Sequence, residues 1–168
     1  MNSVFRSSLI LLVLLIAAPA SAQEPVGCDK FKWPVDRERA LLASSSQMTS
    51  GGTISQPLGS AVLVTLVPIT EAKLPIAPSR VPKSSDTYAG FIHVPAIPNA
   101  GTYRITSSHS AWIDAVQNGH ELKSVAFSGV SGCDGIAKSV KFELKAEPFV
   151  IELSGTTASA VAIVVTPD

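Results

Sequence analysis

The chain has 168 residues, with 13 basic and 13 acidic side chains and therefore a formal net charge of zero. This balance excludes a polybasic surface for nucleic acid or for anionic membranes. Without its first 22 residues the chain has 146, a length that suits one domain with a hydrophobic core.

The first 22 residues predict a secretory signal peptide. Arg6 precedes an apolar run over 9–18, and Ala20-Ser21-Ala22 supplies the small residues of a cleavage site. The apolar run is well short of the roughly 20 residues that span a bilayer. We therefore expect cleavage after Ala22, a soluble protein in the periplasm or the extracellular medium, and no stable membrane anchor after cleavage.

The two cysteines, Cys28 and Cys133, both follow the predicted cleavage site. An even pair in an oxidising compartment predicts a disulfide, with metal ligation or a reactive thiol as the alternatives. Metal sites usually use close cysteine pairs, whereas these two lie 105 positions apart. A disulfide between them would hold the N-terminal segment on the domain and stabilise the fold by about 4–5 kcal/mol in the chain-entropy description.

The segment 31–43 predicts one short helix. Pro34 suits the first helical position, and Asp36 and Glu38 favour the positive end of the helix dipole. The residues over 44–52 are rich in Ser, Thr and Gly, which predicts a polar linker. Residues 23–52 are therefore interpreted as an N-terminal helical arm and linker.

Strand-like patterning begins with 61–67. Apolar residues occupy both odd and even positions of this segment, which predicts a strand buried on both faces. The next segment, 69–87, contains Pro75, Pro78 and Pro82, which cannot join a central strand. It predicts a long, extended connection. A connection of this length in a compact domain is usually functional or wraps the surface.

Short apolar or alternating segments continue to the end of the chain. The dipeptide Asn118-Gly119 predicts a tight hairpin turn, because both positions tolerate positive φ. The predicted strands after residue 87 are 88–94, 102–106, 112–117, 121–127, 140–144, 148–153 and 160–165. This spacing, with no alternation of strands and helices, predicts an all-β domain over 53–168. Its expected architecture is an antiparallel β-sandwich, jelly-roll or pre-peptidase-like, with one short N-terminal helix.

Four residues are candidates for binding. Trp33 and Trp112 could act as aromatic platforms for sugars. The alternative is that Trp112 lies in the core and Trp33 packs the helix on a sheet. Arg104 and Asp114 lie in predicted strands, where they could line a polar site, form an ion pair or face solvent.

The sequence contains no convergent acid–base pair, metal-ligand spacing or phosphate-binding loop, so we assign no catalytic residue, metal ligand or cofactor. We expect a non-enzymatic binding or interaction module of the cell envelope. Its expected partner is a protein or glycan of the envelope, and not nucleic acid.

Residues 101–105, 142–144 and 161–165 resemble strands of bacterial pre-peptidase-type β-sandwich domains, which share the Gly-Thr-Tyr strand start. The whole mature chain, from Cys28 and the Phe31-Lys32-Trp33-Pro34 segment to Gly132-Cys133, resembles a group of small exported bacterial proteins of unassigned function. Some members of that group are labelled homogentisate 1,2-dioxygenase.

The dioxygenase label implies a cupin with Fe²⁺ bound by two histidines and a glutamate. It gives the alternative function, a cupin-like non-haem iron dioxygenase, with His93, His109 and His120 as the candidate ligands. No two of these histidines are two positions apart, as a His-x-His pair on one strand would require. An iron site would therefore have to form through tertiary folding.

Overall fold

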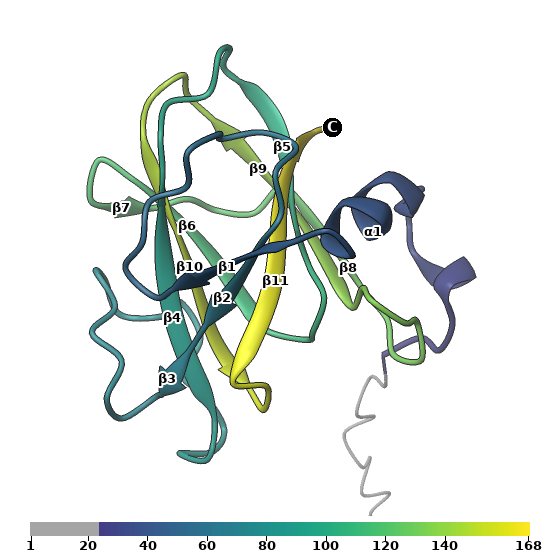
Figure 1. Ribbon diagram of the computed structural model, residues 1–168, viewed down its shortest axis with the longest axis horizontal. Coiled ribbons are helices and arrows are strands. Elements are labelled where there is room, and N and C mark those ends of the chain that lie inside the picture. The colour runs from purple at the N-terminus through teal and green to yellow at the C-terminus, as the bar shows by residue number, and fades with distance from the viewer. Residues whose placement is uncertain (1–23) are drawn as a thin grey trace, which may run out of the picture.

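The structure is a computed structural model that describes residues 24–168. The predicted signal peptide lies outside the described residues. Within them, two β-sheets pack face to face, and one short α-helix lies beside the six-stranded sheet (Figure 1). The predicted all-β sandwich is confirmed.

The helical elements are the 3₁₀ turn η1 (Cys28–Lys30) and α1 (Asp36–Leu42). The strands are β1 (Ser46–Thr49), β2 (Val62–Thr65), β3 (Val67–Pro68), β4 (Tyr88–Val94), β5 (Gly101–Ser107), β6 (Trp112–Gln117), β7 (His120–Glu121), β8 (Ala126–Gly129), β9 (Lys138–Leu144), β10 (Phe149–Thr156) and β11 (Ala160–Pro167). One sheet has the order β1-β2-β11-β5-β9-β8 and the other β3-β4-β10-β6-β7. Neighbouring strands are antiparallel except β1 and β2, which are parallel.

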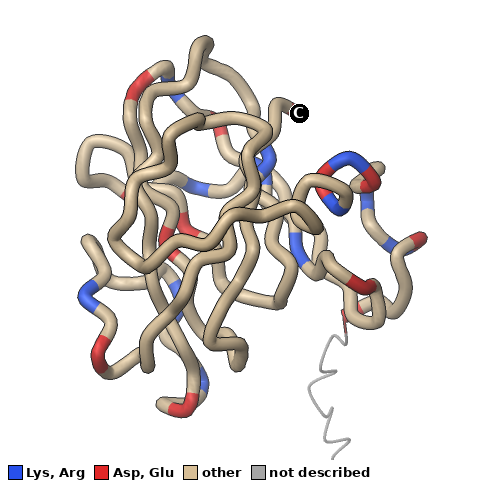
Figure 2. The backbone as a smooth tube through the Cα atoms, viewed as in Figure 1, with Lys and Arg blue, Asp and Glu red and all other residues tan. Residues whose placement is uncertain are grey.

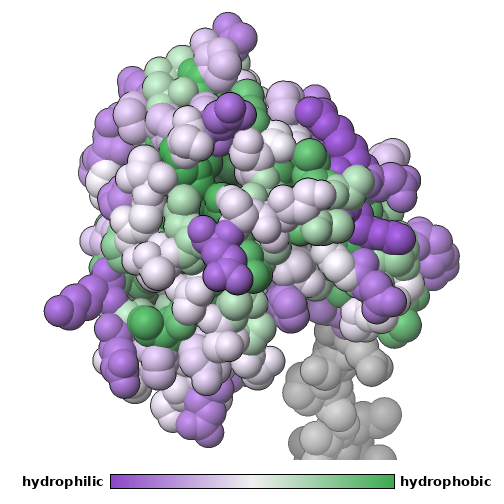
Figure 3. Space-filling view, in the orientation of Figure 1, coloured by the Kyte–Doolittle hydropathy of each residue, from purple (hydrophilic) through white to green (hydrophobic). Residues whose placement is uncertain are grey.

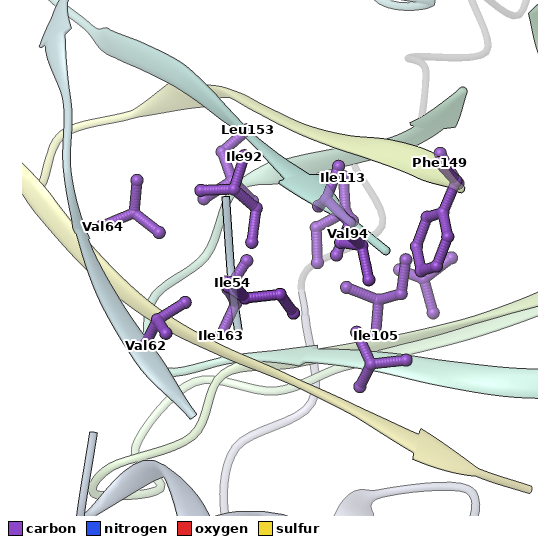
Figure 4. Close-up of a cluster of buried hydrophobic side chains, with 14 of the residues drawn as sticks. Ile54, Val62, Val64, Ile92, Val94, Ile105, Ile113, Phe149, Leu153 and Ile163 are labelled. Atoms are coloured by element: carbon purple, nitrogen blue, oxygen red, sulfur yellow. The ribbon is translucent and has the colours of Figure 1, made fainter. Parts of the chain in front are cut away.

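The core lies between the two sheets and follows the two-residue period of the strands. Figure 4 shows its side chains meeting there: Ile92, Val94, Ile113, Phe149 and Leu153 from the five-stranded sheet, and Val62, Val64, Ile105 and Ile163 from the six-stranded sheet. Each of these side chains is almost fully buried. Burial of such a side chain contributes about 1.5–3 kcal/mol, which makes this layer the main source of stability.

A second apolar cluster lies on the outer face of the six-stranded sheet. Residues 24–45, which we call the arm, cover this face, and Val35 and Leu42 of the arm pack with Ala162 and Val164 of β11. The strand β11 is thus buried on both faces. The predicted disulfide between Cys28 and Cys133 is confirmed, with an S–S distance of 2.02 Å, and it ties the start of the arm to the loop before β9.

The predicted helix over 31–43 is too long, because α1 spans only Asp36–Leu42. Residues before it run over the sheet instead: the Lys32 N–H donates to Ser128 Oγ at 3.0 Å, and the indole of Trp33 reaches Ser139. These contacts with the sheet compete with helix formation. Pro34 therefore precedes the helix and is not its first residue.

The linker prediction over 44–52 is wrong for Ser46–Thr49, which forms the edge strand β1. Only Met48 of this strand turns toward the core, so the sequence shows no alternating apolar pattern. The sheet therefore begins inside the segment that was interpreted as arm and linker.

The single strand predicted over 121–127 is also wrong. The turn at Asn118 and Gly119 forms as expected, with φ of 54° and 76°, but β7 ends at Glu121. The chain then crosses between the sheets, and β8 (Ala126–Gly129) pairs with β9 in the other sheet. Apolar patterning alone does not show this change of sheet.

Candidate functional site

Residues 69–87, which we call the strap, form an extended connection on the outer face of the five-stranded sheet. The Ile69 N–H donates to the Thr87 carbonyl at 2.8 Å and closes the base of the strap. Its half-buried side chains alternate with exposed ones over Ala72, Leu74, Ile76 and Pro78. The predicted extended connection is confirmed, and alternate side chains of it face the sheet.

Two buried carboxylates hold the strap. Asp114 of β6 and Glu152 of β10 are register partners, 5% and 1% exposed. Asp114 accepts hydrogen bonds from the Ser79 hydroxyl at 2.6 Å and the Ser79 N–H at 3.2 Å. Glu152 Oε1 accepts from the Ile76 N–H at 3.0 Å. These carboxylates satisfy strap N–H groups that no neighbouring strand pairs.

Burial raises the pKa of Glu152. The hydrogen bond from Ile76 opposes this rise, and the nearby charges of Asp114 and Glu121 add to it. The second oxygen, Glu152 Oε2, is buried without a hydrogen-bond partner among residues 24–168. The ionised form of Glu152 is therefore disfavoured in the folded protein.

Trp112 begins β6 beside the strap. Its indole makes contacts through its N–H group and over the face of its ring. Its Nε1–H donates to Asp114 Oδ1 at 3.0 Å and also lies against Ser79 Oγ. The Lys138 Nζ lies 4.8 Å and the Arg80 Cζ 5.2 Å from the ring centroid. Both distances are within the range of cation–π contacts.

A pocket of about 260 Å³ opens next to this tryptophan. Its walls come from the strap, the starts of β6 and β9, and the end of β10, where Gly155 adopts a φ of 65° at an irregularity in the strand. The polar groups that line it are three cations, one carboxylate and four hydroxyls: Arg80, Lys83, Lys138, Glu24, Ser84, Thr87, Ser110 and Ser154. Trp112, Val81, Pro82 and Ala111 add apolar surface.

Lys138 is the lining cation with the most perturbed environment. Burial lowers its pKa, the negative charges of Glu24 and Asp114 oppose this, and the positive charge of Arg80 lowers it further. Within residues 24–168, Arg80, Lys83 and Lys138 form no salt bridge. The pocket therefore contains cationic groups without a closely paired anion.

The four predicted binding residues lie in two places. Trp112 and Asp114 meet beside the pocket, whereas Trp33 of the arm and Arg104 of β5 lie where the arm packs on the other sheet. The Trp33 Nε1–H donates to Ser139 Oγ at 3.2 Å, which is the packing role foreseen as its alternative. Arg104 does form ion pairs, with Asp168 at 3.0 Å and Glu38 at 3.6 Å. These two residues attach the arm.

Sequence analysis missed Arg80, Glu152 and Ser154 as residues of this region. Glu152 did carry a signal, because it stands inside the apolar run Val150-Ile151-Glu152-Leu153. A carboxylate in the middle of a buried strand needs a partner. Arg80 carried no comparable signal, since exposed cations are common in loops.

The three histidines lie on separate elements: His93 in β4, His109 after β5, and His120 in β7. In the part of the chain that the structure describes, no three His, Cys, Asp or Glu side chains are grouped so that they could hold a metal ion. These residues therefore provide no donor set for the iron that the dioxygenase resemblance implies. No helix of the described part is long and apolar enough to cross a membrane.

No protein-family model, no curated protein and no solved structure matches this chain. The chemistry of the site must therefore be interpreted from its own geometry.

Proposed function

We propose that the protein is an exported, soluble binding module of the cell envelope and that its ligand site is the pocket beside Trp112. The observation that carries this proposal is the way the pocket is built. Hydrogen bonds to Asp114 anchor both the indole of Trp112 and the strap at Ser79. A site held in place before the ligand arrives loses less entropy when it binds.

The pocket favours binding over catalysis because its neighbouring carboxylate is already engaged. Both oxygens of Asp114 accept hydrogen bonds, from Ser79 and Trp112. Asp114 is thus occupied in positioning the strap and the indole. The groups left for a ligand are hydroxyls, cations, the carboxylate of Glu24 and apolar surface, which are the usual contacts of a small-molecule site.

Export is supported by two independent features. The first 22 residues have the pattern of a signal peptide, and the Cys28–Cys133 disulfide is compatible with an oxidising compartment. We therefore infer a location in the periplasm or the extracellular medium, with an envelope glycan or protein as the partner. The balanced charge argues against nucleic acid.

Tryptophan fluorescence titrations with envelope glycans and peptidoglycan fragments test this function. A ligand should change the emission of the wild type, and by titration calorimetry it should bind at least tenfold more weakly to Trp112→Ala, which lacks the reporting indole. Trp33→Phe is the matched control, since Trp33 lies in the arm on the other sheet, and its affinity should equal that of the wild type.

Two results would overturn the proposal. One is the absence of any ligand at millimolar concentration in a screen that covers glycans and envelope proteins. The other is purified protein that contains stoichiometric iron and loses it on His93→Ala, which would support the dioxygenase alternative.

A further inference from the structure

Charge and hydrogen bonding in the pocket restrict the class of ligand. Three cations and one carboxylate line it, so its formal charge is +2 when all four groups are ionised. Arg80 and Lys138 both contact the ring of Trp112, and Arg80 disfavours the protonated form of Lys138. An anion between these two cations would relieve their mutual repulsion and form charge-assisted hydrogen bonds.

Ser154 of β10, the register partner of Trp112, points to the same class of ligand. Its hydroxyl is buried, the residue being 1% exposed, and it lines the pocket without a hydrogen-bond partner among the described residues. A buried hydroxyl without a partner is costly. A ligand oxygen in the pocket would provide the missing acceptor.

The size and the remaining lining favour a hydroxylated ring. The volume of about 260 Å³ lies just below the roughly 300–1,000 Å³ of drug-sized sites, which suits one small ring. Ser84, Thr87 and Ser110 add hydroxyl groups that can exchange hydrogen bonds with ring hydroxyls. The walls come from strands and the strap, and no helix N-terminus, which is the usual phosphate cradle, is among the described lining residues.

We propose that the ligand is an acidic sugar unit whose carboxylate lies between Arg80 and Lys138 and which offers an oxygen to Ser154. This inference rests on the proposed function, because it names the ligand class of the same pocket. The carboxylate binds without any covalent step. It also gives these cations a close anionic partner, since they form no salt bridge within residues 24–168.

Matched sugars distinguish the contribution of the carboxylate to binding from the contribution of the sugar ring. Glucuronate, glucose and glucose 6-phosphate share one ring and differ only at one position, which carries a carboxylate, a hydroxymethyl or a phosphate group. N-acetylmuramic acid and N-acetylglucosamine form a second pair, with the acid on a lactyl group. Titration calorimetry should show that at least one acid binds tenfold or more tightly than its neutral analogue, with affinity that falls as salt rises.

Variants then test the individual contacts. Lys138→Met should weaken binding of the acid at least tenfold and remove most of its advantage over the neutral sugar. Lys141→Met is the matched control, because Lys141 lies on the same strand and its Nζ is 4.5 Å from the ring centroid of Trp33 instead. It should leave binding unchanged.

Ser154→Ala distinguishes a ligand contact from a structural role. Removal of an unpartnered buried hydroxyl should leave the melting temperature unchanged or raise it, while the acid binds about fivefold more weakly. A variant with unchanged affinity would contradict the contact between Ser154 and the ligand.

The outcomes separate this inference from the proposed function. Equal binding of acid and neutral sugar, or tighter binding of the phosphate, overturns the carboxylate assignment and leaves a binding module. If all five sugars fail at millimolar concentration while another ligand in the broader screen binds, the inference alone is overturned. If no ligand binds in either screen, both proposals are overturned.

Discussion

The two outer faces of the sandwich are covered by segments that are held in different ways. The arm lies on the six-stranded sheet and is held by a disulfide, an apolar cluster and one buried ion pair. The strap lies on the five-stranded sheet and, within the described structure, is held by hydrogen bonds to two carboxylates and by half-buried side chains. The strap lines the pocket together with Glu24 of the arm and Lys138 of the six-stranded sheet. The arm is thus assigned mainly to stability and the strap mainly to binding.

The arm behaves as part of the domain core. Val35 and Leu42 are 6% and 4% exposed, and they pack on β11 from the side opposite the main core. Figure 2 shows acidic and basic residues together on α1, and Figure 3 shows strongly hydrophilic side chains over the same helix. The helix is thus amphipathic, with its apolar side on the sheet and its charges toward solvent, apart from the buried Glu38.

The strap depends more on a stiff backbone than on a large buried surface to stay docked on the sheet. Prolines at 75, 78 and 82 restrict its backbone and lower the entropy that it loses on docking. Because each carboxylate anchor fixes one short stretch, loss of an anchor should loosen the strap without unfolding the sandwich. The following predictions test this division, from the largest expected effect to the smallest.

Removal of the disulfide should have the largest effect. In Cys28→Ser/Cys133→Ser the free energy of unfolding should fall by about 4–5 kcal/mol, because the bond closes a loop over 105 positions. Urea unfolding measures this loss. Thiol titration of the denatured protein is the control and should find two thiols only after reduction. An unchanged urea midpoint would mean that the arm is held without the bond.

Arg104→Met should lower the free energy of unfolding by about 3 kcal/mol, because it leaves the buried carboxylate of Glu38 without its cation. Urea unfolding measures the loss, and Arg104→Met/Glu38→Gln should recover part of it. Lys30→Met removes an exposed ion pair with Asp29 and should have no measurable effect. Equal losses in the single and double variants would contradict a role for the buried charge.

Asp114→Ala should cost about 2 kcal/mol, since it removes the acceptor of two bonds from Ser79 and one from Trp112. The change should be local: limited proteolysis with mass spectrometry should find new cuts in 69–87 and none in the arm. Asp114→Asn retains one acceptor oxygen and should lose less. Cuts spread over the whole domain would show that strap and sandwich unfold together.

Glu152→Gln should have the smallest effect, and of the opposite sign. Because burial raises the pKa of Glu152 above the usual 4.5, the folded protein binds the proton more tightly than the unfolded chain does. The ionised group therefore lowers stability above its folded-state pKa, and wild-type stability is regained as the pH falls through that value. Glutamine keeps an acceptor for Ile76 and carries no charge.

The neutral-pH stability of Glu152→Gln should therefore equal or exceed that of the wild type. The difference should vanish as the pH falls toward the ordinary glutamate value. Urea unfolding at several pH values measures both. A variant that is less stable than the wild type by the same amount at every pH would show that the carboxylate charge does not matter.

Much of the strand layout could be predicted because its causes are local. Alternation placed Tyr103 and Ile105 on one face, and Asn118-Gly119 formed the expected turn. The edge strand β1 could not be predicted, since its polar residues contact the sheet mainly through the backbone. The change of sheet between Glu121 and Ala126 was missed because it depends on distant strands.

Two of the four candidate binding residues, Trp112 and Asp114, lie together beside the proposed pocket. Trp112 and Asp114 are two positions apart in one strand, so their side chains share a face whatever the rest of the fold does. Trp33 and Arg104 were grouped with them by chemical type alone. The structure places these two at the contact between the arm and the six-stranded sheet, where the indole of Trp33 meets Ser139 and Arg104 meets Glu38.

The sequence by itself determined the sandwich class, the extended strap and the candidate disulfide. These follow from the periodicity of apolar side chains, the proline content and the even number of cysteines, which are local or compositional properties of the chain. Only the tertiary structure decided which groups meet at the pocket. Lys138 comes from one sheet, Trp112 from the other and Arg80 from the strap that connects the neighbouring strands β3 and β4. Their meeting depends on strand order and register, which arise from packing between segments far apart in sequence.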